Sequence, residues 1–308
     1  MSDFHSFHTL DVFTDTIFGG NPLAVLTDAD GLSTEQMQRI TKEFNLSETV
    51  FVLPPEDASH TRRLRIFTPG RELPFAGHPT VGTAFLLAAA GMIPLTEGET
   101  HIVLEEGVGP VPVTIRVRDG VPVSTQLTAA QAPEFRNDTP GVKEIAELLS
   151  LDVADVATGT FEAELVSCGV PFLLTPLASR DAVRRAKLDR PAWERTLSNG
   201  WAREVFLFDT SAIAASAASG AAIRARMFAP GMGIGEDPAT GAAGACLAAY
   251  LAKHTRDGAA LSWIVEQGFE MGRPSVLALS AEKSGGEIGA IRVAGRSVLV
   301  SEGKIRVA

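Results

Sequence analysis

Two helix-length segments of the chain contain no charged residue. Residues 79–90 and 238–251 consist mainly of alanine, glycine and larger apolar residues. A helix that is apolar on every face must be enclosed on every face, and small residues let the surrounding strands approach closely. The pattern therefore predicts two central helices, each wrapped by its own curved sheet.

The remaining apolar pattern predicts one capped helix and several strands. A helix is expected after Ser33, whose side chain can form a capping box with Gln36, because Met37, Ile40 and Phe44 follow at helical spacing. Runs rich in β-branched and apolar residues predict strands at residues 48–53, 101–104, 111–117, 262–266 and 297–301.

The motif at residues 63–70 occurs twice. Arg-Leu-Arg-Ile-Phe-Thr-Pro-Gly returns at 224–231 as Arg-Ala-Arg-Met-Phe-Ala-Pro-Gly, and residues 78–84 are then matched by 237–243. Matches in the same order over so long an interval indicate a duplicated domain. The arginines of both copies stand just before a Phe-x-Pro turn, which favours pairing with carboxylates over catalysis.

A connector is expected near residues 128–139. Thr139 and Pro140 then predict a helix start, with threonine as N-cap and proline at the first helical position. We therefore expect an α/β (α+β) fold of two pseudo-equivalent domains, residues 1–128 and 129–308, with a last strand that can return to the first domain. A chain of 308 residues is long enough for two such cores.

The net charge of −10 disfavours nucleic acids and anionic membranes as partners, since their phosphates are bound by clustered Lys and Arg. A small anionic ligand remains compatible with it. Cys168 and Cys246 are the only cysteines, which argues against a disulfide framework. No signal-peptide pattern is evident, and the most apolar stretch, 81–93, is shorter than the about 20 residues of a membrane span. We expect a cytoplasmic protein.

Three titratable residues are candidates for chemistry. His78 and Asp237 open the two uncharged helices, where unpaired N–H groups favour a carboxylate ligand. Aspartate before proline is a common N-cap, but histidine is a poor one, so its presence at the equivalent position favours a function. Glu48 stands between a helix and an apolar strand, either as an exposed strand-start residue or as a general acid/base.

Six motifs, in order along nearly the whole chain, resemble the phenazine-biosynthesis PhzF family. They are Gly20-Asn21-Pro22, Asn45-Leu46-Ser47-Glu48-Thr49, Phe67-Thr68-Pro69, Gly77-His78-Pro79-Thr80, Glu236-Asp237-Pro238-Ala239-Thr240-Gly241, and Gln267-Gly268 with Met271-Gly272-Arg273-Pro274-Ser275. The resemblance implies a diaminopimelate-epimerase-like fold and a homodimer. It also implies an isomerase, without cofactor or metal, that moves a proton within a small substrate. The family's type reaction is the isomerisation of trans-2,3-dihydro-3-hydroxyanthranilate.

The resemblance also assigns residue roles. By position, Glu48 corresponds to the proton-shuttling glutamate, while His78 and Asp237 correspond to polar residues of the substrate site. Gly77 falls where a backbone N–H meets substrate, and the second helix start supplies Thr240, Gly241 and Ala242 as substrate-binding residues. The family pattern has serine where this chain has Ala242, so the family substrate does not follow from the resemblance.

Two alternatives stay open. A non-catalytic protein on the same fold that binds a small molecule is compatible with the loss of the serine hydroxyl at Ala242. An amino-acid or hydroxy-acid epimerase is the other alternative, although Cys168 and Cys246 do not stand at the helix starts where a two-thiol racemase needs them. Both cysteines are expected to be small buried side chains.

Overall fold

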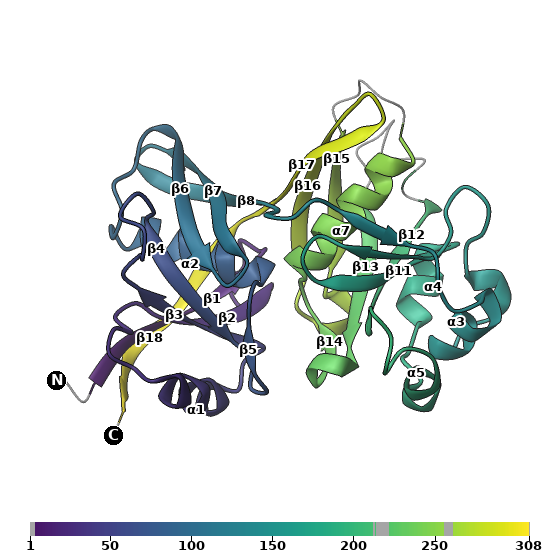
Figure 1. The fold of residues 1–308 in the computed structure, drawn as a ribbon, viewed down its shortest axis with the longest axis horizontal. Helices are drawn as coiled ribbons and strands as arrows, with labels where there is room; N and C mark the ends of the chain where they lie inside the picture. Colours follow the sequence, from purple (N-terminus) through teal and green to yellow (C-terminus); the bar gives the residue numbers. More distant parts are fainter. Residues whose placement is uncertain (1–3, 212, 214–221, 256–260, 308) are drawn as a thin grey trace. The chain divides into compact units, whose positions relative to one another are not determined.

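The computed structural model describes residues 4–211, 213, 222–255 and 261–307 (Figure 1). By its contacts the chain divides into two compact units. Unit 1 comprises Met1–Ala130 together with Val293–Ala308, and unit 2 comprises Gln131–Arg292. The final segment of the chain therefore packs with the first.

In unit 1 a mixed sheet is built around two parallel strand pairs. β1 (Phe4–Val12) lies between β18 (Ser297–Arg306) and β2 (Asn21–Leu26). β2 pairs in parallel with β3 (Glu48–Leu53), and β4 (Arg62–Phe67) pairs in parallel with β6 (Gly98–Glu106). The antiparallel strands β7 (Gly109–Arg118) and β8 (Val121–Thr128) extend the sheet from β6, and the short β5 (Glu72–Leu73) pairs with β4.

Each parallel pair of unit 1 is joined by a helix, as parallel connections require. α1 (Thr34–Phe44) joins β2 to β3, and α2 (Gly77–Ala89) joins β4 to β6. The predicted capping box between Ser33 and Gln36 is confirmed, since each side chain accepts the other residue's backbone N–H. Met37 and Ile40 lie on the buried face of α1, as their helical spacing predicted.

Unit 2 repeats this topology. β11 (Pro171–Leu177) pairs in parallel with β12 (Glu204–Asp209), and β13 (Ile223–Ala229) pairs in parallel with β15 (Leu261–Gln267). α4 (Arg180–Arg185) and α5 (Arg190–Thr196) join the first pair, while α7 (Gly241–Lys253) joins the second. Unit 2 also contains β9 (Glu134–Arg136), α3 (Val142–Leu148), β10 (Glu164–Ser167), β14 (Ile234–Asp237) and β16 (Ser275–Ser284), and β17 (Glu287–Gly295) ends in the segment that belongs to unit 1. The equivalent order of parallel pairs confirms the duplication.

The two uncharged helices are enclosed as predicted. α2 packs against β1, β2, β3, β7 and β8, and α7 packs against β10, β11, β15 and β16. Their small residues permit this close packing. A Cβ added to Gly82 of α2 would lie 2.6 Å from Cγ2 of Val12 and 2.7 Å from Cδ2 of Leu23. Leucine and valine side chains of the sheet therefore fill the space that a larger helical residue would need.

The boundary between the units, at Ala130 and Gln131, falls within the predicted connector, of which residues 134–136 form β9 and pair with β10. The predicted start of the next helix was wrong. The helix begins at Val142 rather than at Pro140, because Gly141 is the N-cap and its N–H donates to the Glu144 carboxylate at 2.8 Å. This side chain closes the first turn two residues after the predicted start. None of the helices in the described ranges is long and apolar enough to cross a membrane.

Candidate active site

Glu48 and His78 lie close together in unit 1, where β3 and α2 begin. Glu48 is the first residue of β3, and His78 is the second residue of α2. The distance from His78 Nε2 to Glu48 Oε2 is 3.5 Å, and the two residues are only 4% and 8% exposed. A carboxyl group and an imidazole therefore share one nearly buried position, beside the backbone of Gly77, the first residue of α2.

Asn21 fixes the orientation of the His78 ring. Its side-chain nitrogen lies 3.2 Å from His78 Nδ1, and its side-chain oxygen accepts the Ser47 hydroxyl proton at 2.9 Å. Asn21 thus holds the ring from its Nδ1 side, and Nε2 lies on the side of Glu48. Sequence reasoning missed this role of Asn21, although Gly20-Asn21-Pro22 is one of the six motifs that resemble the family.

The imidazole of His78 is held in its neutral form. Burial lowers its pKa to about 3, against an opposing effect of the Pro22 backbone, because a charged ring would lose its hydration in this position. Near neutral pH, His78 can therefore donate one proton in a hydrogen bond without carrying charge.

The prediction that Asp237 opens the second central helix is wrong. Asp237 ends β14, and α7 begins at Gly241 with Thr240 as N-cap. The reason is Gln267, whose side chain donates to the Asp237 carbonyl at 2.7 Å and accepts from the Thr240 N–H at 3.1 Å. These bonds hold residues 237–240 outside the helix. The Thr240 hydroxyl also donates to the Asp237 carboxylate. Asp237 is buried, with 6% of its surface exposed.

The predicted site residues thus fall into two groups. Glu48, His78 and Gly77 lie in unit 1, at the starts of β3 and α2. Asp237, Thr240, Gly241 and Ala242 lie in unit 2, at the end of β14 and the start of α7, where Ala242 is half-buried. Gln267 belongs with the second group, and its motif in the sequence does not predict its bonds to Asp237 and Thr240. The residues are about thirty positions apart, so no local pattern indicates the contact.

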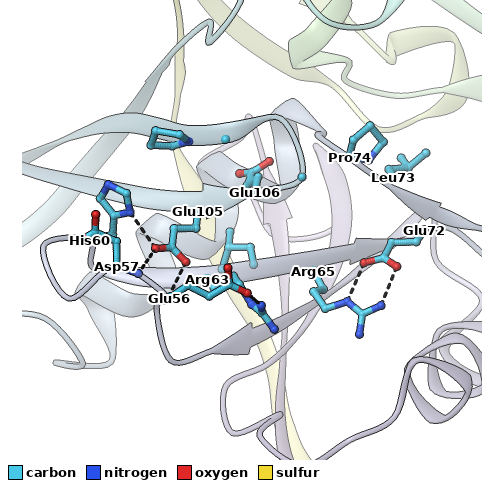
Figure 2. Close-up of a pocket in the computed structure, with 14 residues that line it drawn as sticks. Glu56, Asp57, His60, Arg63, Arg65, Glu72, Leu73, Pro74, Glu105 and Glu106 are labelled. Carbon is cyan, nitrogen blue, oxygen red and sulfur yellow. Dashed lines mark hydrogen bonds and ion pairs between the residues drawn. The ribbon is translucent and has the colours of Figure 1, made fainter.

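Unit 1 also contains a cleft of about 860 Å³ between β4, β5 and the hairpin of β6 and β7 (Figure 2). Its basic side chains each have a carboxylate partner: Arg65 bonds Glu72 twice at 2.7 Å, Arg63 pairs with Glu56, and His60 lies 2.8 Å from Glu105. In unit 2, Arg226 pairs likewise with Glu236, and Arg224 lies 3.5 Å from Glu266. The predicted pairing of the repeated arginines with carboxylates is confirmed.

The two cysteines are buried, free thiols, as predicted. Cys246 lies within α7, and burial raises the pKa of its thiol above the ordinary range. Cys168 lies between β10 and β11. Neither thiol stands at the start of a central helix, so the geometry gives no support to a two-thiol racemase.

Comparison with known proteins assigns the chain to a family. A model of the family described as phenazine biosynthesis-like protein (PhzC-PhzF) matches residues 10–303. The chain belongs to this family. It is 40% identical over 301 residues to an uncharacterized isomerase of Mesorhizobium japonicum, which covers 96% of each chain. It is 34% identical over 300 residues to the trans-2,3-dihydro-3-hydroxyanthranilate isomerase of Pseudomonas aeruginosa, covering 97% of this chain and 99% of that one.

A solved structure shows the same architecture for another PhzF family member. The phenazine biosynthesis protein of Bacillus anthracis matches with a TM-score of 0.85 and 28% identity over 99% of each chain. The predicted fold class and the prediction of a PhzF-like isomerase are therefore confirmed.

Proposed function

We propose that this PhzF-like isomerase moves a proton within a small carboxylate-bearing substrate, with Glu48 as general acid/base and without a cofactor. The observation that carries the proposal is the pairing of Glu48 with the neutral His78, both nearly buried, at the start of α2. A carboxylate in such a position can take a proton from an activated C–H bond and return it to another carbon of the same molecule. The double bond shifts as the proton moves, so no electrons leave the substrate.

His78 would support this transfer as a neutral donor. Its Nε2 lies 3.5 Å from Glu48 Oε2, and a proton on Nε2 would hold the carboxylate in one orientation during both halves of the proton transfer. Gly77 would offer a backbone N–H to the substrate carboxylate, since helix N-termini favour anions. Asp237, Thr240 and Gly241 of unit 2, where Thr240 donates to Asp237, stay predicted site residues.

Ala242 limits what is proposed about the substrate. A methyl group cannot hydrogen-bond a substrate group that the family serine would hold, and an unpaired polar group in a closed site costs binding energy. The proposal therefore names the reaction and the substrate class, not the phenazine precursor itself. The homodimer and the cytoplasmic location stay predictions.

Isotope exchange in heavy water tests the proposal. The enzyme is incubated with trans-2,3-dihydro-3-hydroxyanthranilate and with a panel of unsaturated or chiral small carboxylates, and deuterium entering C–H positions is measured by mass spectrometry. We expect incorporation by the wild type and a loss of at least 100-fold in Glu48→Gln, because general acid–base catalysis contributes about 10²–10⁴-fold. Glu43→Gln, an exposed change on the preceding helix, is the matched control.

The same experiment separates the alternatives. A binding protein without turnover would bind a compound and exchange no label. An epimerase would exchange label at a stereocentre and lose optical activity without shifting a double bond. Full activity in Glu48→Gln on a compound that the wild type turns over would exclude Glu48 as the acid/base.

A further inference from the structure

Both central helices begin beside the end of a neighbouring parallel strand. β6 ends at Glu106 and β15 ends at Gln267. Each of these residues follows directly after the last residue of its strand that pairs with the neighbouring parallel strand. These last pairs are Arg63 opposite Glu105 in unit 1 and Arg224 opposite Glu266 in unit 2. Glu106 and Gln267 are therefore structural equivalents, although the repeated motifs of the sequence do not include them.

The glycines that follow confirm this equivalence. A Cβ added to Gly107 would lie 2.8 Å from Cα of Pro74, and one added to Gly268 would lie 2.6 Å from the carbonyl oxygen of Pro238. Pro74 and Pro238 both belong to the segments that lead into the central helices. In each unit the strand end thus presses directly against the helix start, with a buried side chain immediately before the contact.

Glu106 reaches both ends of the first turn of α2. Its Oε1 lies 2.6 Å from the Thr80 hydroxyl oxygen, and the backbone N–H of the N-cap Ala76 also bonds its carboxyl group. The Thr80 hydroxyl is itself 2.7 Å from the Ala76 carbonyl oxygen. Gly77 and His78 lie between the two residues that Glu106 holds. In unit 2, Gln267 likewise bonds the N–H of the N-cap, Thr240, and its second bond goes to the carbonyl of Asp237.

We propose that Glu106 is a positioning residue, which fixes the first turn of α2 and thereby the placement of Gly77 and His78, as Gln267 fixes the corresponding segment of unit 2. The proposal rests on the proposed function only in giving these two residues a catalytic use. Glu106 itself touches Thr80 and the backbone, not Glu48, so its effect passes through the helix start.

The contacts of Glu106 require its neutral acid form. The Thr80 hydroxyl has one proton, which cannot make both of its short bonds, whereas a protonated Glu106 can donate to Thr80 while Thr80 donates to Ala76. A protonated carboxyl group then matches the carboxamide of Gln267, with one donor and one acceptor. Burial raises the pKa of Glu106 to about 8, so this form prevails at neutral pH.

The charged and titratable groups around Glu106 come from several elements. His78 belongs to the same turn of α2 and stays neutral at these pH values, since burial lowers its pKa to about 3. The others line the cleft on β4, β5, β6 and the segment before β4: Glu56, Asp57, His60, Arg63, Arg65, Glu72 and Glu105 (Figure 2). Because Glu106→Gln leaves all of them in place, the difference between variant and wild type isolates Glu106.

Hydrogen exchange tests the proposal without a substrate. Protection factors of the amides of Gly77, His78, Thr80 and Val81 are measured from pH 6 to 10 in wild type, Glu106→Gln, Glu106→Leu and the exposed control Glu99→Gln on the same strand. We expect the wild type to lose protection at least tenfold above pH 8 and Glu106→Gln to keep it. Glu106→Leu should lack protection at every pH. Equal pH profiles for the wild type and Glu106→Gln would overturn the proposal.

Two further readouts guard against misinterpretation. If Glu106→Leu does not fold, the ratio of folded to unfolded protein is compared between wild type and Glu106→Gln. As the pH rises from 5 to 8, this ratio should fall in the wild type relative to Glu106→Gln by up to tenfold per pH unit. A constant ratio overturns the proposal. If the exchange result holds but Glu48→Gln keeps full turnover, the positioning role stands and the proposed function fails.

Discussion

His78 and Glu106 are both buried beside the first turn of α2, yet burial moves their pKa values in opposite directions. The pKa of His78 falls to about 3, and that of Glu106 rises to about 8. In both cases burial favours the neutral form. For His78 this is the deprotonated imidazole, and for Glu106 it is the protonated carboxyl group. Each neutral group lies beside a hydrogen-bonding partner, His78 beside Asn21 and Glu106 beside Thr80. Burial thus sets the protonation states around the helix start.

A pH titration of stability checks the state of His78. In the unfolded chain this histidine binds a proton below about pH 6.5, whereas in the folded chain it does not until about pH 3. The unfolded state therefore binds more protons in this window, and stability falls as the pH is lowered through it, by at most about 1.4 kcal/mol per pH unit. Urea unfolding from pH 7 to 4 should show a steeper loss in the wild type than in His78→Gln.

The matched control is His101→Gln, because the side chain of His101 is 72% exposed. Its stability curve should run parallel to that of the wild type. Parallel curves for the wild type and His78→Gln would show instead that the buried ring accepts a proton as readily as a free one.

At the scale of secondary structure, the central helices trade intrinsic helix propensity for close packing. Glycine in a helix interior costs about 1 kcal/mol relative to alanine. Gly82 is nevertheless used in α2 because the side chains of Val12 and Leu23 occupy the position of its missing Cβ. The first turn shows a similar dependence on neighbours, since Ala76 makes no side-chain cap and Glu106 of β6 bonds its backbone instead.

Gly82→Ala should therefore destabilise the protein despite its better helix propensity. The contacts of 2.6 and 2.7 Å require Val12 and Leu23 to move, and overpacking of this kind costs about 1–3 kcal/mol. The free energy of unfolding, measured in urea, should fall by that amount. Gly70→Ala is the control, because the atom nearest to its added Cβ is 3.8 Å away. Increased stability of Gly82→Ala would contradict the packing argument.

At the scale of the whole molecule, the two ends of the chain meet in one sheet. β18, the last strand, pairs with β1, the first, along its whole length from Phe4 opposite Arg306 to Val12 opposite Ser297. Unit 1 therefore needs residues from both ends, whereas unit 2 is continuous from Gln131 to Arg292. The completeness of the Glu48 and His78 site thus depends on residues more than two hundred positions away.

Truncation after Arg292 should unfold unit 1 selectively. Without β18, β1 loses one of its two neighbours and exposes an unpaired edge. Hydrogen exchange followed by mass spectrometry should show loss of protection in β1 and β2 and retained protection in β11 and β12. Removal of Val307 and Ala308 alone is the control, since it leaves all of β18. Unchanged protection of β1 in the long truncation would contradict this view of unit 1.

The sequence by itself determined the features that depend on neighbouring residues or on composition. The capping box at Ser33, the enclosed helices and the duplicated order of motifs all follow from short patterns, and the motif set indicated the PhzF family. Only the tertiary structure decided what depends on residues distant in sequence. Gln267 keeps Asp237 out of α7, Asn21 contacts the ring of His78, and Glu106 bonds Thr80 in the first turn of α2. These contacts join separate strands and helices, so no local pattern encodes them.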